Sequence, residues 1–219
     1  ILRTAWLHEG QTLAEVTRRL SDGLGIAATI GPMTNDPVAT MVQTPDGELT
    51  FQDYFVRRQQ QDAVIGVRFA GIERASATQE ALDGIAAAAL IVFCPSNPIV
   101  SIGPLLAIPE LRAAVERSRA PRIAVSPIIA GKALKGPADK MLASLGYEAS
   151  AAGVATILRP LLDGYVLDEQ DAGAIPAIEA MGLTARALQT IMGGKDDRAR
   201  LGREVIGFGL SLRADVARI

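Results

Sequence analysis

The sequence predicts an α/β protein: a doubly wound, mostly parallel sheet with an inserted β-hairpin and helical subdomain. Three observations point to this fold. From residue 76 onward, helical periodicity alternates with short apolar runs, as in sheets whose parallel strands are joined by helices. The runs at 89–94 and 122–129 are apolar almost throughout, which is typical of strands buried on both faces. Earlier in the chain, two strand-like runs flank a Pro-Asp-Gly turn at 45–47, which predicts a hairpin.

The first 75 residues predict one helix followed by three strands. Thr12 and Glu15 have the spacing of a capping box, which marks the start of a helix. Gly23 and Gly25 are expected to end that helix. The three strand-like runs lie at residues 39–44, 48–58 and 63–72.

Helices and strands are expected to alternate through the rest of the chain. Ser76 and Gln79 suggest a second capping box, Pro109 suits the first turn of a helix, and Ser150 suits an N-cap. The expected helices cover residues 76–87, 108–119, 136–146, 150–162 and 195–212. The expected strands cover residues 89–94, 122–129, 164–170 and 185–192.

Composition and charge exclude several classes of function. The formal net charge is -2, so neither a nucleic acid nor a membrane is expected as a partner. No apolar run approaches the roughly 20 residues that span a bilayer, and a cytoplasmic location is expected. The single Cys94 excludes an internal disulfide and is expected to be a buried, inert thiol inside a strand. With His8 as the one histidine, zinc or iron chemistry is not expected.

The chain begins without an initiator methionine, and residues 1–3 read as though they lay inside a helix. We therefore expect an N-terminal part of the fold to be missing from this sequence. The 219 residues are expected to form a single α/β domain. Within it, residues 1–75 would form the helix and hairpin subdomain, and residues 76–219 the alternating part of the core.

Two loops that follow predicted strands carry the residues suited to chemistry. The first reads PSNP at 95–98 and SIGP at 101–104, and the second reads SPIIAGKALKGP at 126–137. Both loops should open at one edge, because the carboxyl ends of parallel strands meet there. Serine and asparagine offer hydrogen bonds, glycine allows close approach of the backbone, and proline fixes φ. The candidate residues are Ser96, Asn97, Pro98, Ser101, Gly103, Lys132, Lys135 and Gly136.

These loops are suited to a phosphate-bearing ligand. Lys132 and Lys135 lie three residues apart and could meet two phosphoryl groups of a diphosphate. A helix beginning after each loop adds its positive end. However, loops rich in proline and glycine also end strands without binding anything, and most lysines are simply solvated. There is no P-loop motif, and the glycine fingerprint of a dinucleotide-binding dehydrogenase is absent from the sequence.

Three stretches resemble the 2-phospho-L-lactate transferase family of coenzyme F420 biosynthesis. They are LIVFCPSNPIVSIGPLLAIPELRAA (90–114), FQDYFVRR (51–58) and SPIIAGKALKGPADKML (126–142). The segment GPMTNDPV (31–38) is similar too, although Asn35 stands where the family commonly has an acidic residue. The resemblance covers most of residues 1 to about 195.

The resemblance implies a Rossmann-like core and a specific reaction. Family members transfer a phospholactyl or phosphoenolpyruvyl group from a guanosine diphosphate-linked donor to the deazaflavin Fo (7,8-didemethyl-8-hydroxy-5-deazariboflavin). GMP leaves, a phosphodiester forms on the ribityl hydroxyl, Mg²⁺ is required, and the enzymes are usually homodimers. The candidate residues of the two loops would then cradle the donor phosphates or the nucleotide, since phosphoryl-type transfer depends on positioning and charge neutralisation.

Further candidates and alternatives stay open. Arg57 could neutralise donor charge or be an exposed arginine at a strand end, and Thr34 and Asp36 could bind or merely form a turn. No catalytic residue is assigned, and the metal ligands are expected in the missing N-terminal part. The segment 31–38 also resembles a PMT-x-DPV turn in a related family, the gluconeogenesis factors, which are regulators that bind nucleotide sugars. That family's loop of the type GPGSLYTS differs from PSNPIVSIGP, which favours the enzyme.

Overall fold

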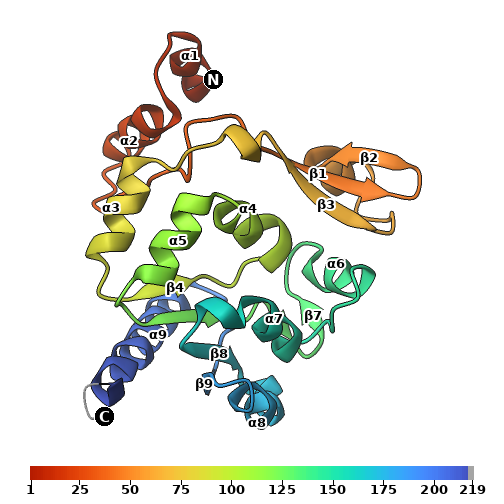
Figure 1. The fold of residues 1–219 in the computed structure, drawn as a ribbon, viewed down its shortest axis with the longest axis vertical. Coiled ribbons are helices and arrows are strands. Elements are labelled where there is room, and N and C mark those ends of the chain that lie inside the picture. The colour runs from red at the N-terminus through yellow and green to blue at the C-terminus, as the bar shows by residue number, and fades with distance from the viewer. Residues whose placement is uncertain (217–219) are drawn as a thin grey trace.

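The computed structural model in Figure 1 describes residues 1–216, with side chains as far as Leu212. Its core is a four-stranded sheet of order β4-β5-β8-β9, and every neighbouring pair is parallel. The strands are β4 (Ile91–Phe93), β5 (Arg122–Val125), β8 (Gly164–Asp168) and β9 (Thr184–Leu188). This confirms the expected α/β fold with a parallel sheet. Within residues 1–216 the strands follow their sequence order, so all of their carboxyl ends lie along one edge of the sheet.

Both faces of this sheet are buried, as the continuous apolar runs predict. Ile123 and Val125 of β5 pack with Phe208 of α9 (Lys195–Val216), which covers one face. Ala124 points the other way and joins a larger cluster with Val154 of α7 (Ala151–Leu158). Alternation along the strand therefore divides its side chains between two hydrophobic layers, one on each side of the sheet.

Helices join the strands. Their bounds are α3 (Gln79–Ala87), α4 (Gly103–Leu106), α5 (Pro109–Arg117), α6 (Ala138–Ser144) and α8 (Ile175–Glu179). Pro109 and Ser150 act as expected: the proline occupies the first turn of α5, and the Ser150 hydroxyl accepts a 3.0 Å hydrogen bond from the Gly153 N–H at the start of α7. The predicted tail helix is confirmed as α9.

The N-terminal part forms two helices and a separate sheet. Helix α1 covers Leu2–His8, and α2 (Leu13–Gly23) begins at the predicted capping box of Thr12 and Glu15. A three-stranded antiparallel sheet follows, in the order β2-β1-β3. Its strands are β1 (Ala39–Thr44), β2 (Gly47–Thr50) and β3 (Gly66–Ala70). Figure 1 shows this sheet, which we call the arm, projecting to one side of the core.

A buried cluster attaches the arm to the core. Tyr54 is fully buried and packs with Val42 of β1 and with Val64, which lies just before β3. Met141 of α6 belongs to the same cluster and is also fully buried. The arm is thus held to the core by side chains packed between the hairpin and α6.

The predicted strand at 48–58 is wrong in its second half. β2 ends at Thr50, and residues Asp53–Arg57 form a π-helical turn. The Thr50 hydroxyl accepts a 3.1 Å hydrogen bond from the Asp53 N–H and donates one to the Asp53 carboxylate, which favours a helical start over a continued strand. A turn of this kind also lets Tyr54 reach the buried cluster.

The predicted strand at 122–129 is also interrupted. β5 ends at Val125, where the Ser126 hydroxyl accepts a 3.1 Å hydrogen bond from the Ile128 N–H and Pro127 has no N–H to offer. The next pairs form a small antiparallel sheet of β6 (Ile128–Ile129) and β7 (Lys132–Ala133). The apolar run therefore spans a strand and the beginning of a loop.

Several ends differ from those expected. The helix predicted from Ser76 begins at Gln79, because Thr78 provides the cap: its hydroxyl accepts the Ala81 N–H at 3.3 Å. The helix predicted at 150–162 leaves α-helical geometry after Leu158, where Arg159–Leu161 form a 3₁₀ turn containing Pro160. The strands predicted at 63–72, 164–170 and 185–192 are shorter, as their bounds above show.

Cys94 is not the buried thiol that the sequence predicts. β4 ends at Phe93, and Cys94 lies exposed just beyond the strand. The apolar run at 89–94 made it look like part of the strand interior, whereas its last residue already belongs to the loop.

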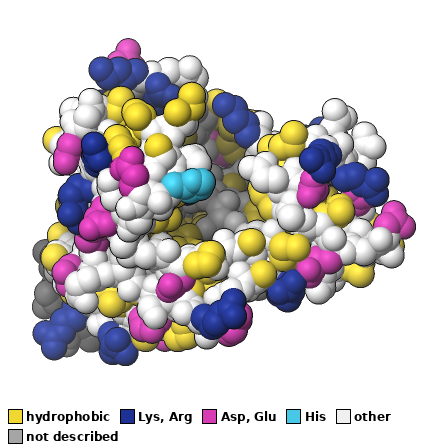
Figure 2. Space-filling model, turned by 90° about the horizontal axis from the view of Figure 1, so that it is seen from above, with side chains coloured by type: hydrophobic (Ala, Val, Ile, Leu, Met, Phe, Trp, Pro, Cys, Tyr) yellow, Lys and Arg dark blue, Asp and Glu magenta, His cyan; other side chains and the backbone are white. Residues whose placement is uncertain are grey.

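The surface and the helices give two further observations. On the face seen in Figure 2, Lys and Arg side chains are interspersed with Asp and Glu, without a large area of one sign. No single helix within residues 1–216 is long and apolar enough to cross a membrane. One pair, Pro98–Leu106 with Pro109–Arg117, has the length and composition only when taken together, and its members meet at an 88° bend.

Candidate functional site

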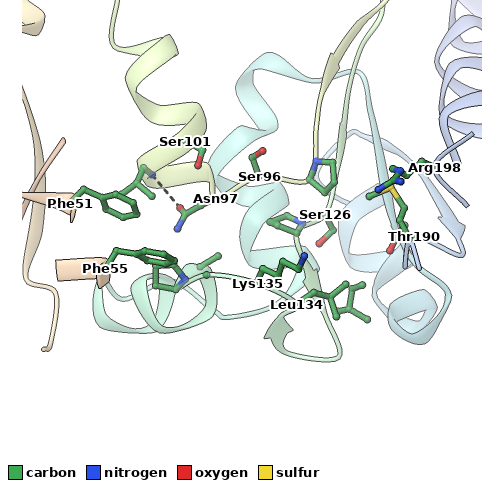
Figure 3. A pocket seen from close by; sticks show the side chains of 18 residues that line it. Phe51, Phe55, Ser96, Asn97, Ser101, Ser126, Leu134, Lys135, Thr190 and Arg198 are labelled. Carbon is green, nitrogen blue, oxygen red and sulfur yellow. Dashed lines mark hydrogen bonds between the residues drawn. The ribbon is translucent and has the colours of Figure 1, made fainter. Parts of the chain in front are cut away.

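A cavity of about 510 Å³ lies at the carboxyl edge of the parallel sheet (Figure 3). Residues that directly follow β4 and β5 line it, among them Pro95 and Ser126, and Thr190 contributes from the segment after β9. This is the edge where ligands bind in open α/β sheets, and the volume lies within the usual range for a small-molecule site. The two loops that the sequence singles out therefore do meet.

The first loop lines the cavity with Ser96, Asn97 and Ser101. The side-chain oxygen Oδ1 of Asn97 accepts hydrogen bonds from the Ile99 N–H at 2.8 Å and the Val100 N–H at 3.2 Å, and so caps the π-helical turn Pro98–Ile102. Its amide nitrogen lies 3.6 Å from the sulfur of Met141. Asn97 thus shapes the loop, while the hydroxyls of Ser96 and Ser101 have no hydrogen-bond partner among the described residues.

The second loop contributes Lys135 and Gly136. Lys135 makes no ion pair with any residue in 1–212, and Figure 3 shows its side chain pointing toward the loop that carries Ser126. Gly136 has a φ of +78°, a conformation that residues with a Cβ rarely adopt. The glycine reverses the backbone so that the chain turns from Lys135 into α6. Lys135 therefore brings an available positive charge to the cavity.

Three of the predicted loop residues do not line the cavity. Pro98 begins the π-helical turn, and Lys132 lies on β7, exposed to solvent. A Cβ on Gly103 would lie 3.1 Å from the ring of Phe69, so this glycine allows β3 to approach the loop. Their roles in ligand binding stay predictions that the cavity geometry does not support directly.

The three additional candidates also lie outside the cavity lining. Arg57 is exposed and forms an ion pair with Asp53 at 2.9 Å. Thr34 is buried, and its hydroxyl accepts the Asp36 N–H at 3.0 Å, while the Asp36 carboxylate accepts the Ser76 N–H at 2.9 Å. Thr34 and Asp36 therefore tie one turn to the start of the core.

Two aromatic residues that the sequence analysis did not select form the opposite wall. The rings of Phe51 and Phe55 stack with centroids 5.5 Å apart and planes at 19°. Phe51 directly follows β2, and Phe55 lies in the π-helical turn Asp53–Arg57. Residues four apart in a strand are separated by about 13 Å, so the strand predicted at 48–58 would have kept these two rings apart. Their spacing of four residues, read as one helical face, would have revealed it.

A further wall of the cavity comes from residues that follow β9, and the sequence analysis did not select these residues either. Thr190, Met192 and Arg198 line the cavity beyond β9. The Asp168 carboxylate, at the end of β8, accepts hydrogen bonds from the Thr190 N–H at 2.9 Å and from its hydroxyl at 2.8 Å. No short motif marks these residues, because the contact joins positions 22 apart. We call this pair the Asp168–Thr190 clamp.

Asp168 is held as a carboxylate. Burial alone would raise its pKa, but hydrogen bonds from the backbone N–H groups of Gln170 and Thr190 and from the Thr190 hydroxyl outweigh burial and hold the pKa of Asp168 below its usual value. Because the pKa is lower in the folded than in the unfolded state, this carboxylate stabilises the protein above its unfolded pKa. That stabilisation is lost as the pH falls through the folded pKa.

We expect Asp168→Asn to lower the free energy of unfolding by about 2 kcal/mol at pH 7, because a charged acceptor of several hydrogen bonds is replaced by a neutral one. The difference from the wild type should shrink as the pH falls below the usual aspartate pKa of about 4. Urea unfolding of both proteins at several pH values measures this. A difference that stays constant down to pH 3 would show that the charge of Asp168 is not responsible.

The described residues do not fit the expected Mg²⁺ site. Mg²⁺ is held in proteins by oxygen ligands, carboxylates above all. Within residues 1–212, whose side chains are described, no three His, Cys, Asp or Glu side chains gather closely enough to hold a metal ion. Asp168, the one buried carboxylate beside the cavity, is engaged by Thr190. No metal ligand is therefore assigned in this chain.

The fold and the cavity define a Rossmann-like α/β protein with a ligand site at the carboxyl edge of its parallel sheet. The sequence matches the family described as 2-phospho-L-lactate transferase CofD over residues 1–190, and the chain belongs to this family. The resemblance carried by the two loops and by FQDYFVRR is confirmed.

Curated relatives agree with this assignment. A 2-phospho-L-lactate transferase of Methanosarcina acetivorans is 36% identical over 208 residues, which is 95% of this chain and 67% of the relative. Another, of Halobacterium salinarum, is 44% identical over 170 residues, or 78% of this chain and 49% of the relative. A phosphoenolpyruvate transferase of Streptomyces griseus is 36% identical over 219 residues, or 98% and 69%. The chain thus spans about half to two thirds of these relatives' length.

Solved structures support the fold. A Bacillus halodurans protein of the UPF0052 family superposes with a TM-score of 0.67 at 14% sequence identity, covering 91% of this chain and 70% of that protein. A second crystal structure of the same protein gives a TM-score of 0.69 at 15% identity, covering 94% of this chain and 70% of that protein. At such identity the likeness concerns the fold alone.

Proposed function

We propose that this protein transfers a phospholactyl or phosphoenolpyruvyl group from a guanosine diphosphate-linked donor to Fo, with GMP as the leaving group. Support comes from the family and from relatives named for each of the two groups. The observation that carries the proposal is the cavity itself. It combines an aromatic wall with a lysine that has no ion pair, and with two serine hydroxyls that have no hydrogen bond, within residues 1–212. A cation and hydroxyls suit phosphate groups, and aromatic rings suit the flat rings of a nucleotide or deazaflavin.

In this reaction the terminal ribityl hydroxyl of Fo attacks the phosphorus that bears the lactyl or enolpyruvyl oxygen. A bond forms from the ribityl oxygen to that phosphorus, and the bond from phosphorus to the bridging oxygen of the diphosphate breaks. GMP leaves with the bridging oxygen, and the hydroxyl proton is released. Such a transfer needs charge neutralisation and alignment rather than a protein nucleophile, which agrees with a cavity that has no cysteine or histidine in its lining.

Lys135 is proposed to neutralise the diphosphate as charge moves onto the leaving oxygen. Ser96 and Ser101, on the neighbouring loop, would donate hydrogen bonds to phosphate oxygens. Asn97 contributes indirectly, since its side chain holds the loop that carries both serines. These three loop positions would fix where the donor phosphates lie.

The stacked pair Phe51–Phe55 is proposed to bind the flat deazaflavin ring of Fo. Stacking against an aromatic side chain contributes about 1–3 kcal/mol. We expect Phe55→Ala to raise the KM for Fo about tenfold while the affinity for GDP is unchanged. Val56→Ala, which alters an exposed neighbour that does not line the cavity, is the control. A loss of GDP affinity with an unchanged KM for Fo would instead assign this wall to guanine.

The remaining expectations belong to the same proposal. Mg²⁺ dependence, a homodimer and a cytoplasmic location are implied by the resemblance and stay predictions. Removal of Mg²⁺ with EDTA should abolish transfer, and restoring Mg²⁺ should recover it. Sedimentation of the purified protein measures its oligomeric state.

The deciding experiment is an anaerobic transfer assay on the full-length gene product. It supplies Fo, Mg²⁺ and either guanylylated donor, phospholactate or phosphoenolpyruvate, and detects the product by mass. The expected mass is that of Fo joined to the acid through a phosphodiester, and the preferred donor identifies the group. If neither donor reacts and a UDP-sugar binds tightly instead, the protein is a nucleotide-sugar-binding regulator and the proposal is overturned.

A further inference from the structure

We propose that Arg198 binds the carboxylate of the acid group that is transferred, and so selects donors that carry one. This inference rests on the proposed function. It concerns a residue beyond the segment 1–190 that matches the family, in the helix that closes the described part of the chain. Nothing in the sequence pattern assigned this helix to the site.

The guanidinium of Arg198 can take a ligand, whereas that of its neighbour Arg200 is bound to other residues of the protein. Arg200 donates to Glu204 at 2.8 Å and to the Gln189 carbonyl oxygen at 2.9 Å. The guanidinium of Arg198 makes no hydrogen bond or ion pair with any side chain in residues 1–212, and it lines the cavity. A cation that faces a ligand-sized cavity without a protein partner is suited to an anionic ligand group.

Two carboxylates hold the backbone segment that leads to Arg198. The Asp168–Thr190 clamp fixes the segment that leaves β9 against the end of β8. Further along, the Asp197 carboxylate accepts hydrogen bonds from the Gly193 N–H at 2.9 Å and the Gly194 N–H at 3.2 Å. Two carboxylates therefore determine the path of residues 190–197, and hence the position from which Arg198 enters the cavity.

The order of groups along the cavity assigns the two cations to different parts of the donor. In Figure 3, Phe51 and Phe55 lie at one end, Lys135 in the middle and Arg198 at the other end. The proposed function places the deazaflavin of Fo against the two phenylalanines, and in the product the phosphate lies between Fo and the acid. The carboxylate of the acid is therefore expected at the end of the cavity remote from the aromatic wall. Arginine presents a planar pair of N–H donors that matches a carboxylate, whereas lysine acts on phosphates as a point charge.

The test compares three variants of the full-length protein: Arg198→Gln, Arg198→Lys and Arg203→Gln. Arg203 is exposed on the same helix, does not line the cavity and serves as the matched control. GDP, which lacks the carboxylate, is the binding probe, and its Kd is measured by calorimetry. The KM for the guanylylated donor is measured in the transfer assay.

We expect Arg198→Gln to raise the KM for the donor at least tenfold and to leave the Kd for GDP unchanged. Arg198→Lys should recover little, because it keeps the charge but loses the paired donors. Arg203→Gln should change neither quantity. An equal loss for GDP and donor would make Arg198 a phosphate contact and overturn the inference, as would an unchanged donor KM in an active enzyme. A wild-type protein that neither transfers nor binds GDP would overturn the proposed function itself.

Discussion

Replacement of Lys135 by alanine should lower kcat/KM for the donor about 100-fold, which corresponds to ~2.7 kcal/mol of lost transition-state stabilisation. Lys135 is the one lysine in the cavity lining, and it makes no ion pair within residues 1–212. Removal of one group that stabilises charge developing in a transition state typically lowers kcat about 100- to 1000-fold, and the lower figure is expected here because Lys135 is exposed. Steady-state kinetics with varied donor and saturating Fo measure the effect.

The stability of this variant should be unaffected, since Lys135 is exposed and the free energy of unfolding should change by less than about 0.5 kcal/mol. Lys140→Ala is the matched control: Lys140 is exposed on α6, close in sequence, and lies outside the cavity lining. Lys132→Ala tests the second predicted cation, and its position on β7 leads us to expect less than a threefold effect. If the Lys132 and Lys135 variants lose equal amounts of kcat/KM for the donor, Lys135 is not the lysine that specifically neutralises the donor phosphates.

The largest effect on stability is expected for Tyr54→Ala. Tyr54 is fully buried where the arm packs on α6, and removal of a buried aromatic ring costs about 3–5 kcal/mol. The melting temperature should fall by about 10 °C. Because the cavity wall of Phe51 and Phe55 is attached through this cluster, the affinity for Fo should fall as well.

Two controls separate packing from other causes. Tyr54→Phe keeps the ring and should remain within about 1 kcal/mol of the wild type. Tyr147→Ala removes a tyrosine that is 44% exposed and should have little effect on the melting temperature. If Tyr54→Ala has the melting temperature of the wild type, the cluster of Tyr54 and Met141 does not hold the arm to the core.

Patterns carried by neighbouring residues could be predicted from the sequence. The capping box of Thr12, the hairpin and the apolar runs of the sheet each depend on residues a few positions apart, and all of them form. The two loops with Ser96 and Lys135 follow from the same local patterns, because parallel strands place their carboxyl ends together.

What the sequence did not reveal depends on contacts between distant residues. Cys94 falls outside its strand because β4 ends at Phe93, an end set by pairing with β5. The π-helical turn that stacks Phe51 on Phe55 is stabilised by Tyr54 packing on α6, almost 90 positions away. Arg198 reaches the cavity through the Asp168–Thr190 clamp. No periodicity or short motif encodes such contacts.

Helix α9 links the binding site to the burial of one face of the sheet. Its Leu201, Val205 and Phe208 cover the sheet face that Ile123 and Val166 present, and its first turn carries Arg198. These contacts are long-range, and loop closure makes such contacts form slowly. During synthesis the four strands of this sheet leave the ribosome before α9 does, so the growing chain exposes that apolar face until α9 arrives. A chain that stops before residue 195 would keep the segment 1–190 that matches the family, but it would remain aggregation-prone and lack one end of its binding site.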